Sequence, residues 1–361
     1  MSGTSLDAVD AAMILTDGER VLEFGPAVER VYSDDERTIL KSAVDAAIDW
    51  NWVGPQPEAA FAKALSVLTE THTDAYEKLL SSTKCPKPVL AGVHGQTVLH
   101  RRPSGTSIGA TLQILNEQAL ASALDIPLVY DFRSSDVAAG GQGAPLAPAY
   151  HSALLERLSD EPACVLNLGG IANITAKLSD GSLIAFDTGP ANGPIDEWVD
   201  GHDRGRFDAE GTFARAGRVH EGLLAQLFDH PWFSDPPPKS LDRYDFSASM
   251  ARGLSFEDGA ATLTAFSARS VAAGITLLPE PPKRVIACGG GRRNPALMEA
   301  IRDAVSCPVL VAEDAGWDGD AIEAQAFGFL AVRSIRKLPI SWPQTTGAPL
   351  PMTGGAWLGS L

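Results

Sequence analysis

The chain has 361 residues, and 45% of them are hydrophobic, which is enough to form two ordinary hydrophobic cores. Its formal net charge of −16 argues against nucleic-acid partners, because proteins that bind phosphate backbones concentrate Lys and Arg. The sequence has no apolar run long enough to span a membrane and no basic and apolar regions typical of a secretory signal. We therefore expect a cytoplasmic protein without nucleic-acid or membrane partners.

Short apolar runs alternate with stretches of helical periodicity, which is typical of α/β architecture. We predict strands at residues 10–15, 89–93, 128–130, 164–168, 183–186, 284–288 and 309–311. Helices are predicted at residues 116–124, 260–278, 295–305 and 320–335, where apolar residues recur near helical spacing. Asn294 as N-cap and Pro295 at the first helical position mark the start of the third helix.

Changes in composition indicate where the chain is divided. Residues 138–145 (AAGGQGAP) are rich in small residues, and residues 236–239 (PPPK) are rich in proline. We expect the first of these segments to be the crossing between two domains. Residues 338–355 are predicted to form an irregular tail that returns to the body through residues 356–358.

The cysteines and histidines show no pattern of a disulfide or a metal site. Cys85, Cys164, Cys288 and Cys307 are scattered without a C-x-x-C pair, and the seven histidines lack metal-binding spacing. We expect reduced cysteines, in core positions, and no metal ligated by histidine or cysteine.

The strongest indication of function is Asp187, in the segment FDTGP at residues 186–190, directly after an apolar run. A carboxylate at the end of a buried strand, beside a Gly-Pro turn that admits a ligand, suits the base of a sugar kinase. On its own, the same pattern also fits an aspartate that caps a turn.

Three glycine-containing turns are candidates for holding phosphates through backbone N–H groups. For each of them, an ordinary turn is the alternative interpretation, and their occurrence together favours a single ATP site. The chain has no Gly-Lys dipeptide, which excludes the P-loop class, and no G-x-G-x-x-G near its first strand. The three turns are Gly3-Thr4-Ser5, Gly169-Gly170 at the tip of a predicted hairpin, and Gly289-Gly290-Gly291 between a strand and a helix.

Several segments resemble the signatures of the anhydro-N-acetylmuramic acid kinase family, in that family's order and over essentially the whole chain. The string from residue 131 to residue 145 is highly specific, whereas the glycine turns are shared with the sugar kinase, heat-shock ATPase and actin superfamily. The segments are MSGTSLD (1–7), VHGQT (93–97), DFR (131–133), DVAAGGQGAPL (136–146), NLGGIAN (167–173), FDTGP (186–190), CGGG (288–291) and IEAQAF (322–327).

This resemblance implies an α/β fold of two RNase H-like (actin-like ATPase) domains with an active-site cleft between them. The N-terminal domain would comprise residues 1–137 plus 345–361, and the C-terminal, nucleotide-binding domain would comprise residues 138–344. Family members usually carry a short apolar strand before MSGTS, so the first strand is expected to be missing from this sequence. Its neighbours in the sheet would then lack a pairing partner.

The resemblance also implies a reaction, which uses ATP with Mg²⁺. The 1,6-anhydro ring of anhydro-N-acetylmuramic acid is opened by water and the released O6 is phosphorylated, which gives N-acetylmuramic acid 6-phosphate in peptidoglycan recycling. Asp187 would take the proton of the attacking water while O6 attacks the γ-phosphate. The expected partners are the amino sugar and ATP, and a homodimer is a further expectation.

Further site residues follow from the matched motifs. Arg133 suits the lactyl carboxylate of the sugar, because a guanidinium pairs with a carboxylate through two hydrogen bonds. The sugar pocket would be formed by His94, Gln96, Thr97, Asp131, Arg133 and Glu323. The nucleotide with Mg²⁺ would contact Gly3, Thr4, Ser5, Asp7, Asp10, Gly169, Gly170, Asn173, Gly289, Gly290, Gly291 and Asn294.

Structural interpretations of the sugar-site residues stay open beside these functional ones. His94 also fits a core histidine with satisfied hydrogen bonds. Arg133 also fits a salt bridge with Asp131 or Asp136, and Glu323 also fits a cap on a neighbouring amide.

Two other functional classes are compatible with parts of the sequence. Residues 105–109 (GTSIG) match the G-x-S-x-G nucleophile elbow of hydrolases, with Ser107 as nucleophile. An elbow needs a strand before it and a helix after it, whereas here a polar loop precedes and a strand-like run follows, so we expect a hairpin turn. A non-catalytic ATP-binding member of the same superfamily is the other alternative.

Overall fold

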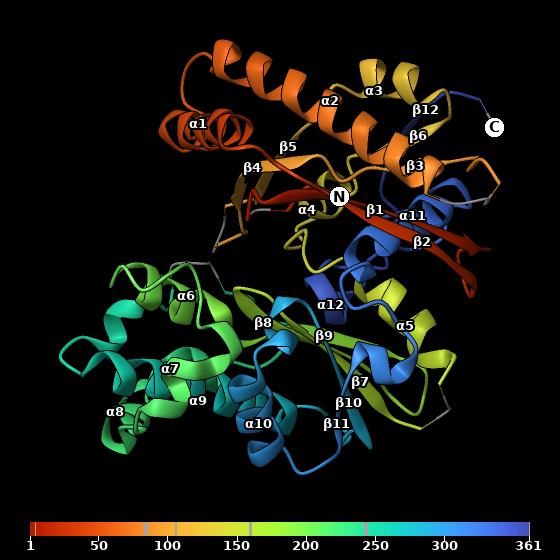
Figure 1. Ribbon diagram of the computed structural model, residues 1–361. Coiled ribbons are helices and arrows are strands. Elements are labelled where there is room, and N and C mark those ends of the chain that lie inside the picture. The colour runs from red at the N-terminus through yellow and green to blue at the C-terminus, as the bar shows by residue number, and fades with distance from the viewer. Residues whose placement is uncertain (4, 83–85, 105–106, 159–160, 242–244, 361) are drawn as a thin grey trace. The chain divides into compact units, whose positions relative to one another are not determined.

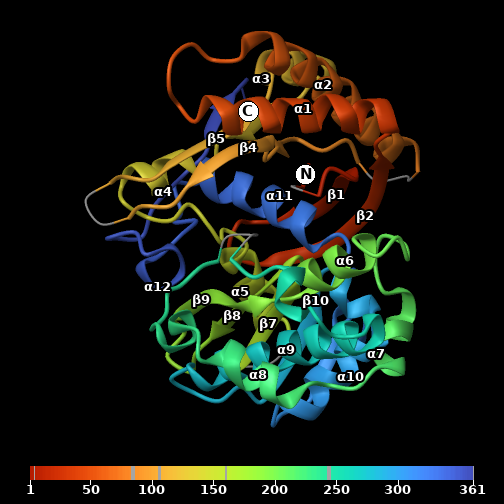
Figure 2. The same ribbon diagram turned by 90° about the vertical axis from the view of Figure 1, so that its left-hand side faces the viewer.

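The computed structural model describes residues 1–3, 5–82, 86–104, 107–158, 161–241 and 245–360. The chain forms two compact units, one of Met1–Leu154 with Ala321–Leu361 and one of Leu155–Asp320. Both units contain helices packed on strands, which confirms the predicted α/β class (Figures 1 and 2). The predicted domain boundaries after residues 137 and 344 remain a prediction.

The second unit is built on a five-stranded mixed sheet with the order β11-β10-β7-β8-β9. β7, β8 and β9 are antiparallel neighbours, while β10 and β11 run parallel to β7. This is the strand order of an RNase H-like domain, as predicted. The strands are β7 (Ala163–Leu168), β8 (Ile171–Lys177), β9 (Leu183–Pro190), β10 (Arg284–Cys288) and β11 (Val309–Val311).

The core of this unit lies on one face of the sheet. Leu166, Phe186 and Leu297 are fully buried there, in a cluster to which α9 and α10 contribute. Full burial of such a side chain stabilises the fold by about 1.5–3 kcal/mol. The helices of the unit are α6 (Asn192–Asp200), α7 (Thr212–Ala216), α8 (Glu221–Phe228), α9 (Phe256–Thr276) and α10 (Pro295–Ala304).

The first unit contains three small sheets. β1 (Ala8–Thr16) pairs with β2 (Val21–Val31), and β4 (Gln96–Arg101) pairs with β5 (Ala110–Ile114), both antiparallel. The third sheet has the order β12-β6-β3, in which β6 pairs parallel with β3 and antiparallel with β12. Its strands are β3 (Ala91–Gly92), β6 (Leu128–Tyr130) and β12 (Ala356–Leu358).

Helices α1 and α2 pack on β1 and on the β4–β5 hairpin through buried side chains such as Leu40, Leu68 and Val98. In Figure 1, α1 and α2 run across the top of this unit, and α11 contacts β1 and β3. The helices are α1 (Asp34–Trp50), α2 (Glu58–Ser81), α3 (Glu117–Leu124), α4 (Ser134–Ala138), α5 (Pro148–Glu156), which runs into the second unit, α11 (Ile322–Ile335) and α12 (Pro343–Thr346).

Several predicted elements differ from the structure in length. The strand predicted at residues 183–186 continues to Pro190, because residues 187–190 pair with the start of β8, so Asp187 lies within the strand and not after it. The strand predicted at 89–93 is only Ala91–Gly92. The helix predicted at 260–278 begins at Phe256, where the Ser255 hydroxyl caps the amide of Asp258.

The predicted start of α10 is confirmed. Asn294 caps α10, since its Oδ1 accepts from the amides of Ala296 and Leu297 at 3.1 and 3.2 Å. Cys164 and Cys288 are buried and Cys307 is partly buried, whereas Cys85 lies outside the described residues. Over the part of the chain that the structure describes, no helix combines the length and the apolar character needed to cross a bilayer.

Gly92 is the point where α11 comes close to β3. A Cβ atom at this position would lie 2.1 Å from the carbonyl oxygen of Phe327 and 2.9 Å from the Cβ of Ala331. A backbone oxygen cannot move aside without shifting the helix, so only glycine fits here.

We therefore expect Gly92→Ala to lower the free energy of unfolding by about 1–3 kcal/mol, the usual cost of overpacking a core. Urea denaturation measures the change. Gly328→Ala on α11 is the matched control, because its added methyl would meet only Ile14 at 3.6 and 3.8 Å. If both variants unfold at the same urea concentration as the wild-type protein, α11 does not pack against Gly92 as closely as the structure indicates.

Candidate functional site

A row of polar residues crosses the sheet of the second unit. Asn167 of β7 lies opposite Asn173 of β8, and Asn173 lies opposite Asp187 of β9. Residues directly opposite each other point to the same face, so these three side chains share one face of the sheet. It is the face opposite the α9–α10 core, and all three residues are partly exposed in a sheet that is otherwise largely buried.

Two backbone contacts fix Asp187 within this row. Its amide donates to the carbonyl of Lys239 at 2.9 Å, and its Oδ2 accepts from the amide of Leu241 at 2.7 Å. A carboxylate held in this way by a neighbouring segment has a defined orientation, which a general base requires.

Lys239 anchors the segment that holds Asp187. Its ammonium donates to the carbonyls of Trp232 and Phe233 at 3.0 and 3.3 Å and lies 4.1 Å from the ring centroid of Trp232. Burial lowers the pKa of this side chain, and nearby Asp235 acts in the opposite direction. The sequence gives no local signal for this role of Lys239, because the role depends on a contact with a distant strand.

We expect Lys239→Met to reduce kcat about tenfold, since the loss of its hydrogen bonds and cation–π contact frees the segment that orients Asp187. Steady-state kinetics and thermal unfolding measure the two effects. Lys283→Met, at a surface position of the same unit, is the control. A fall in unfolding temperature with an unchanged kcat would show that Lys239 stabilises the fold without positioning Asp187.

The two glycine turns of this unit converge on the end of β7. Gly169 and Gly170 form the tip of the β7–β8 hairpin, and their carbonyls accept the amides of Ala191, Asn192 and Gly193 at the start of α6. A Cβ at Gly291 would lie 2.7 Å from the Cβ of Leu168. Two of the three predicted glycine turns therefore lie together beside the polar row.

The two sides of the Gly289–Gly291 loop have different surroundings. Gly289 has φ +76°, and a Cβ there would lie 2.5 Å from Oδ1 of Asn167, so no side chain fits on that side. At Gly290, in contrast, a Cβ would meet nothing within 4 Å. The loop is therefore packed on one side and open on the other.

Arg292 holds the same loop in place. Its Nη1 donates to the carbonyl of Gly289 at 3.0 Å, and its guanidinium forms ion pairs with Glu313 and Asp320 at 2.6 and 2.9 Å. Burial alone would lower the pKa of Arg292, but the hydrogen bonds with Asp320 and Glu313 raise it above its ordinary value. The arginine therefore acts as a fixed cation that braces the glycine loop.

A second cluster of predicted residues, the Arg133 cluster, lies in the first unit. Arg133 donates through Nε to Nε2 of His94 at 2.8 Å and through Nη1 to the carbonyl of Gly143 at 2.6 Å. His94 is buried, and its Nδ1 lies 2.8 Å from the carbonyl of Gly95. Among the described residues, none accepts a hydrogen bond from Nη2 of Arg133, and no ion pair joins Arg133 to Asp131 or Asp136.

The protonation states in this cluster follow from its geometry. Burial, followed by the charge of Arg133, lowers the pKa of His94 well below its usual value, so the ring is neutral with its proton on Nδ1. Burial lowers the pKa of Arg133 to about 10, while the charges of Glu323 and Asp136 act in the opposite direction. Arg133 is therefore a cation at neutral pH.

Asp136 organises the loop that presents Gly143 to Arg133. Its carboxylate is buried and accepts from the amide of Gly143 at 2.8 Å and from the hydroxyls of Ser341 and Thr346. These bonds tie residues 136–143 to the C-terminal segment of the same unit. The buried carboxylate of Asp136 thus has a structural role, because it holds this loop in place. In the sequence, the only indication of this role was the position of Asp136 in the DVAAGGQGAP string.

The other predicted sugar-site residues occupy different surroundings. Gln96 is buried and donates to the carbonyls of Gly3 and Thr97 at 3.3 and 3.2 Å. Asp131 has φ +52° and accepts from the hydroxyl of Ser134. Glu323 lies exposed in the first turn of α11, where its charge acts on Arg133.

The N-terminal turn is described except for Thr4, which lies outside the described residues. Asp7 is exposed, and its Oδ1 accepts from the Ser5 hydroxyl and the Ala8 amide at 2.5 and 3.0 Å. Asp10 is partly buried in β1, and burial raises its pKa to about 6 although the Met1 ammonium acts in the opposite direction. Burial also disfavours the charged form of the Met1 amino group, and it therefore lowers the pKa of that group to about 6.

The candidate nucleophile Ser107 lies in the connection between β4 and β5, of which residues 105 and 106 are outside the described residues. Ser104 and Ser107 exchange backbone hydrogen bonds of 3.1 and 2.9 Å, and the chain continues into β5. A strand therefore follows Ser107, whereas a nucleophile elbow is followed by a helix.

Comparison with known proteins gives matches over nearly the whole chain. A family model described as anhydro-N-acetylmuramic acid kinase matches residues 1–359. An anhydro-N-acetylmuramic acid kinase of Rhizobium rhizogenes is 48% identical over 359 residues, which cover 98% of this chain and 96% of the relative. One of Phenylobacterium zucineum is 49% identical over 358 residues, which cover 98% and 97%.

Among solved structures, an activator of 2-hydroxyisocaproyl-CoA dehydratase from Clostridium difficile, with bound ADPNP, is 12% identical. The match covers 91% of this chain and 96% of that chain, with a TM-score of 0.41.

Proposed function

Because the chain belongs to the anhydro-N-acetylmuramic acid kinase family, we propose that it opens 1,6-anhydro-N-acetylmuramic acid with water and phosphorylates the released O6 with ATP. The product is N-acetylmuramic acid 6-phosphate, and the process is peptidoglycan recycling in the cytoplasm. The observation that carries this proposal is Asp187, held by two backbone contacts beside two glycine turns.

Asp187 acts as the general base of this reaction. Its carboxylate takes a proton from a water molecule whose oxygen bonds to the anomeric carbon of the sugar. The bond between that carbon and O6 breaks, and O6 attacks the γ-phosphorus of ATP, with ADP as the leaving group. The backbone contacts with Lys239 and Leu241 keep the carboxylate in one orientation while the proton moves.

The glycine turns of the second unit hold the nucleotide. Phosphate oxygens approach the backbone at Gly290, where no side chain blocks the loop, and Arg292 keeps the loop in shape. Mg²⁺ prefers carboxylate and phosphate oxygens, and Asp7 and Asp10 are the carboxylates of the predicted nucleotide group that fit this preference. When bound, the ion neutralises charge on the phosphates.

The Arg133 cluster recognises the sugar. Arg133 is a cation whose Nε and Nη1 are already engaged, so its Nη2 is directed to the lactyl carboxylate. His94, which is neutral and fixed by Gly95, holds the guanidinium in its plane. Gln96, Thr97, Asp131 and Glu323 complete the proposed sugar contacts.

The direct test is incubation with ATP, Mg²⁺ and 1,6-anhydro-N-acetylmuramic acid, followed by mass spectrometry of the product. The expected product has gained one water and one phosphate group relative to the sugar. A product that has gained phosphate alone would show an ordinary hydroxyl kinase and would contradict the coupled ring opening.

A further inference from the structure

The β4–β5 hairpin of the first unit has an apolar face and a polar face. Val98 and Ile114 are buried in the core that the hairpin shares with α1 and α2. On the other face, four polar and partly exposed side chains stand in two opposed pairs, and opposed residues of an antiparallel pair point to the same side. This polar face consists of Thr97 with Gln113 and His100 with Thr111.

The amide of Gln113 is held in one orientation on this face. Its Nε2 donates to the hydroxyl oxygens of Thr111 at 2.7 Å and of Thr97 at 3.2 Å, which uses both of its hydrogens. Among the described residues, none donates to Oε1 of Gln113. A partly exposed glutamine loses rotamer freedom when it is fixed in this way, so its carbonyl oxygen is an acceptor that is oriented before a ligand binds.

The hydroxyl of Thr97 supplies a donor beside this acceptor. Its oxygen accepts from Gln113, and its hydrogen has no acceptor in the part of the chain that the structure describes. A hydroxyl group can donate and accept at the same time. Gln113 and Thr97 therefore present one fixed acceptor and one neighbouring donor, which are the two partners that a secondary amide needs.

One link between the polar face and the Arg133 cluster runs through Gly95. The carbonyl oxygen of Gly95 lies 2.8 Å from Nδ1 of His94, whose Nε2 accepts from Arg133 at 2.8 Å. A Cβ added at Gly95 would lie 3.5 Å from the Cβ of Gln113. Gln113 therefore packs beside the residue that fixes His94 and, through it, the guanidinium of Arg133.

A second link runs through Gly143. Its carbonyl oxygen accepts from Nη1 of Arg133 at 2.6 Å, and a Cβ added there would lie 3.4 Å from Cε1 of His100. Nδ1 of His100 lies 3.0 Å from the hydroxyl oxygen of Thr111. Helix α4, which follows Arg133, also contacts β5 (Figure 2). The polar face therefore adjoins the Arg133 cluster at two separate points.

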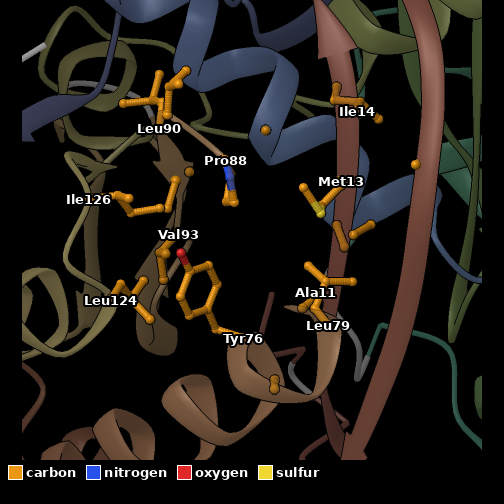
Figure 3. A pocket seen from close by; sticks show the side chains of 18 of the residues that line it. Ala11, Met13, Ile14, Tyr76, Leu79, Pro88, Leu90, Val93, Leu124 and Ile126 are labelled. Carbon is orange, nitrogen blue, oxygen red and sulfur yellow. The ribbon is translucent and has the colours of Figure 1, made fainter. Parts of the chain in front are cut away.

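The large cavity of the first unit suits a polar sugar less well than this face does. The cavity measures about 440 Å³ and lies between β1 and β3, and Figure 3 shows Met13, Leu90 and Ile126 in its mostly apolar lining. None of the described residues that line it belongs to the polar face, and Arg133 and His94 are not among them. Hydroxyl and carboxylate groups are costly to bury without hydrogen-bond partners, which the hairpin face offers and the cavity lining largely lacks.

We propose that Gln113 and Thr97 recognise the acetamido group of the sugar. Oε1 of Gln113 accepts from the acetamido N–H, and the Thr97 hydroxyl donates to the acetamido carbonyl. The acetamido group and the lactyl ether stand on neighbouring ring carbons, so a sugar whose carboxylate meets Arg133 brings its acetamido group to the adjoining face. Thr111 is a positioning residue that fixes the amide of Gln113. The inference rests on the proposed function, because it takes the same sugar as the ligand.

The test measures dissociation constants by titration calorimetry for two ligands. One is 1,6-anhydro-N-acetylmuramic acid, and the other is its 2-O-acetyl analogue, in which an ester oxygen replaces the N–H and the acetyl carbonyl is kept. The proteins are the wild type, Gln113→Met, which keeps the length of the side chain, and Gln118→Met as the matched control. Gln118 is an exposed glutamine on α3 of the same unit.

We expect Gln113→Met to weaken binding of the N-acetyl sugar about tenfold, the effect of losing one hydrogen bond and leaving the N–H without a partner. Binding of the 2-O-acetyl analogue should change by less than about twofold, and Gln118→Met should change neither constant. Equal weakening for both ligands would show a structural role of Gln113, and unchanged binding of the N-acetyl sugar would show no role. Either result overturns the proposal.

Thr111→Val is the second variant, and it decides the question if Gln113→Met does not fold. Valine keeps the branched shape of threonine on β5 and removes the hydroxyl that orients Gln113. We expect about threefold weaker binding of the N-acetyl sugar alone, and a constant equal to that of the wild type would contradict the positioning role.

Turnover of the wild-type protein with ATP and Mg²⁺ is measured separately from binding. Turnover together with unselective effects of Gln113→Met would leave the proposed function intact and overturn this inference. Selective loss of binding without any turnover would support the inference and contradict the proposed function. A wild-type protein that binds neither ligand would overturn both.

Discussion

Asp187→Asn is expected to abolish sugar-dependent ATP turnover while leaving ATP binding nearly unchanged. An amide cannot accept the proton of the attacking water, and loss of a general base lowers rates by about 10²–10⁴-fold. The side-chain oxygen of asparagine still accepts from the Leu241 amide, so the local structure is retained. The measurements are kcat for the anhydro sugar and the dissociation constant for ATP.

Asp303→Asn, at an exposed position on α10, is the matched control and should retain full activity. A variant at residue 187 that keeps more than a tenth of the wild-type kcat would exclude Asp187 as the base. The experiment also addresses the non-catalytic alternative. If the wild-type protein binds ATP and shows no sugar-dependent turnover for the substitution to remove, the chain is a binding module.

The polar row shows what sequence could and could not predict about the second unit. Asp187 and the glycine pairs were found because each belongs to a local pattern of a strand and a turn. The polar row depends on the register of three strands, which cannot be read from the sequence. This register is what places Asn167, Asn173 and Asp187 on one face. An asparagine inside the apolar run of β7 is the available signal for Asn167, which is not among the site residues predicted from the sequence.

The first unit shows a different limit. Helix α1 has a complete capping box, in which Ser33 accepts from the Glu36 amide and Glu36 accepts from the Ser33 amide, yet it was not among the predicted elements. That signal was visible in the sequence. The contact of Arg133 with His94 was not, because it joins residues 39 positions apart and depends on how β3 and β6 place them.

The acidic composition of the protein hides the positive charge at its candidate sites. The formal net charge is −16, but both candidate clusters are built around an arginine, of which Arg292 is buried and Arg133 is partly buried. Each arginine is held by backbone carbonyls or ion pairs, so its position is fixed before any ligand binds. An acidic protein can therefore hold fixed cations: Arg133 keeps one nitrogen available for an anionic ligand, whereas Arg292 is paired with two carboxylates and braces the glycine loop.

Arg133→Lys is expected to raise KM for 1,6-anhydro-N-acetylmuramic acid by about 10- to 100-fold, with a smaller change in kcat. The loss corresponds to one charge-assisted hydrogen bond, about 1.5–3 kcal/mol. A lysine ammonium is a point charge on one nitrogen, so it cannot bond to His94 and Gly143 and still present a separate nitrogen to a carboxylate, as the guanidinium of Arg133 does. Arg20→Lys, at an exposed turn of the same unit, should leave KM unchanged.

A second sugar separates recognition from structure. 1,6-Anhydro-N-acetylglucosamine lacks the lactyl carboxylate, so Arg133→Lys should leave its KM within about twofold of the wild-type value if Arg133 acts on that group. Equal increases in KM for both sugars would instead mean that Arg133 supports the site through His94 and Gly143. The ratio of the two KM changes therefore decides whether this partly buried guanidinium selects the substrate or only shapes the pocket.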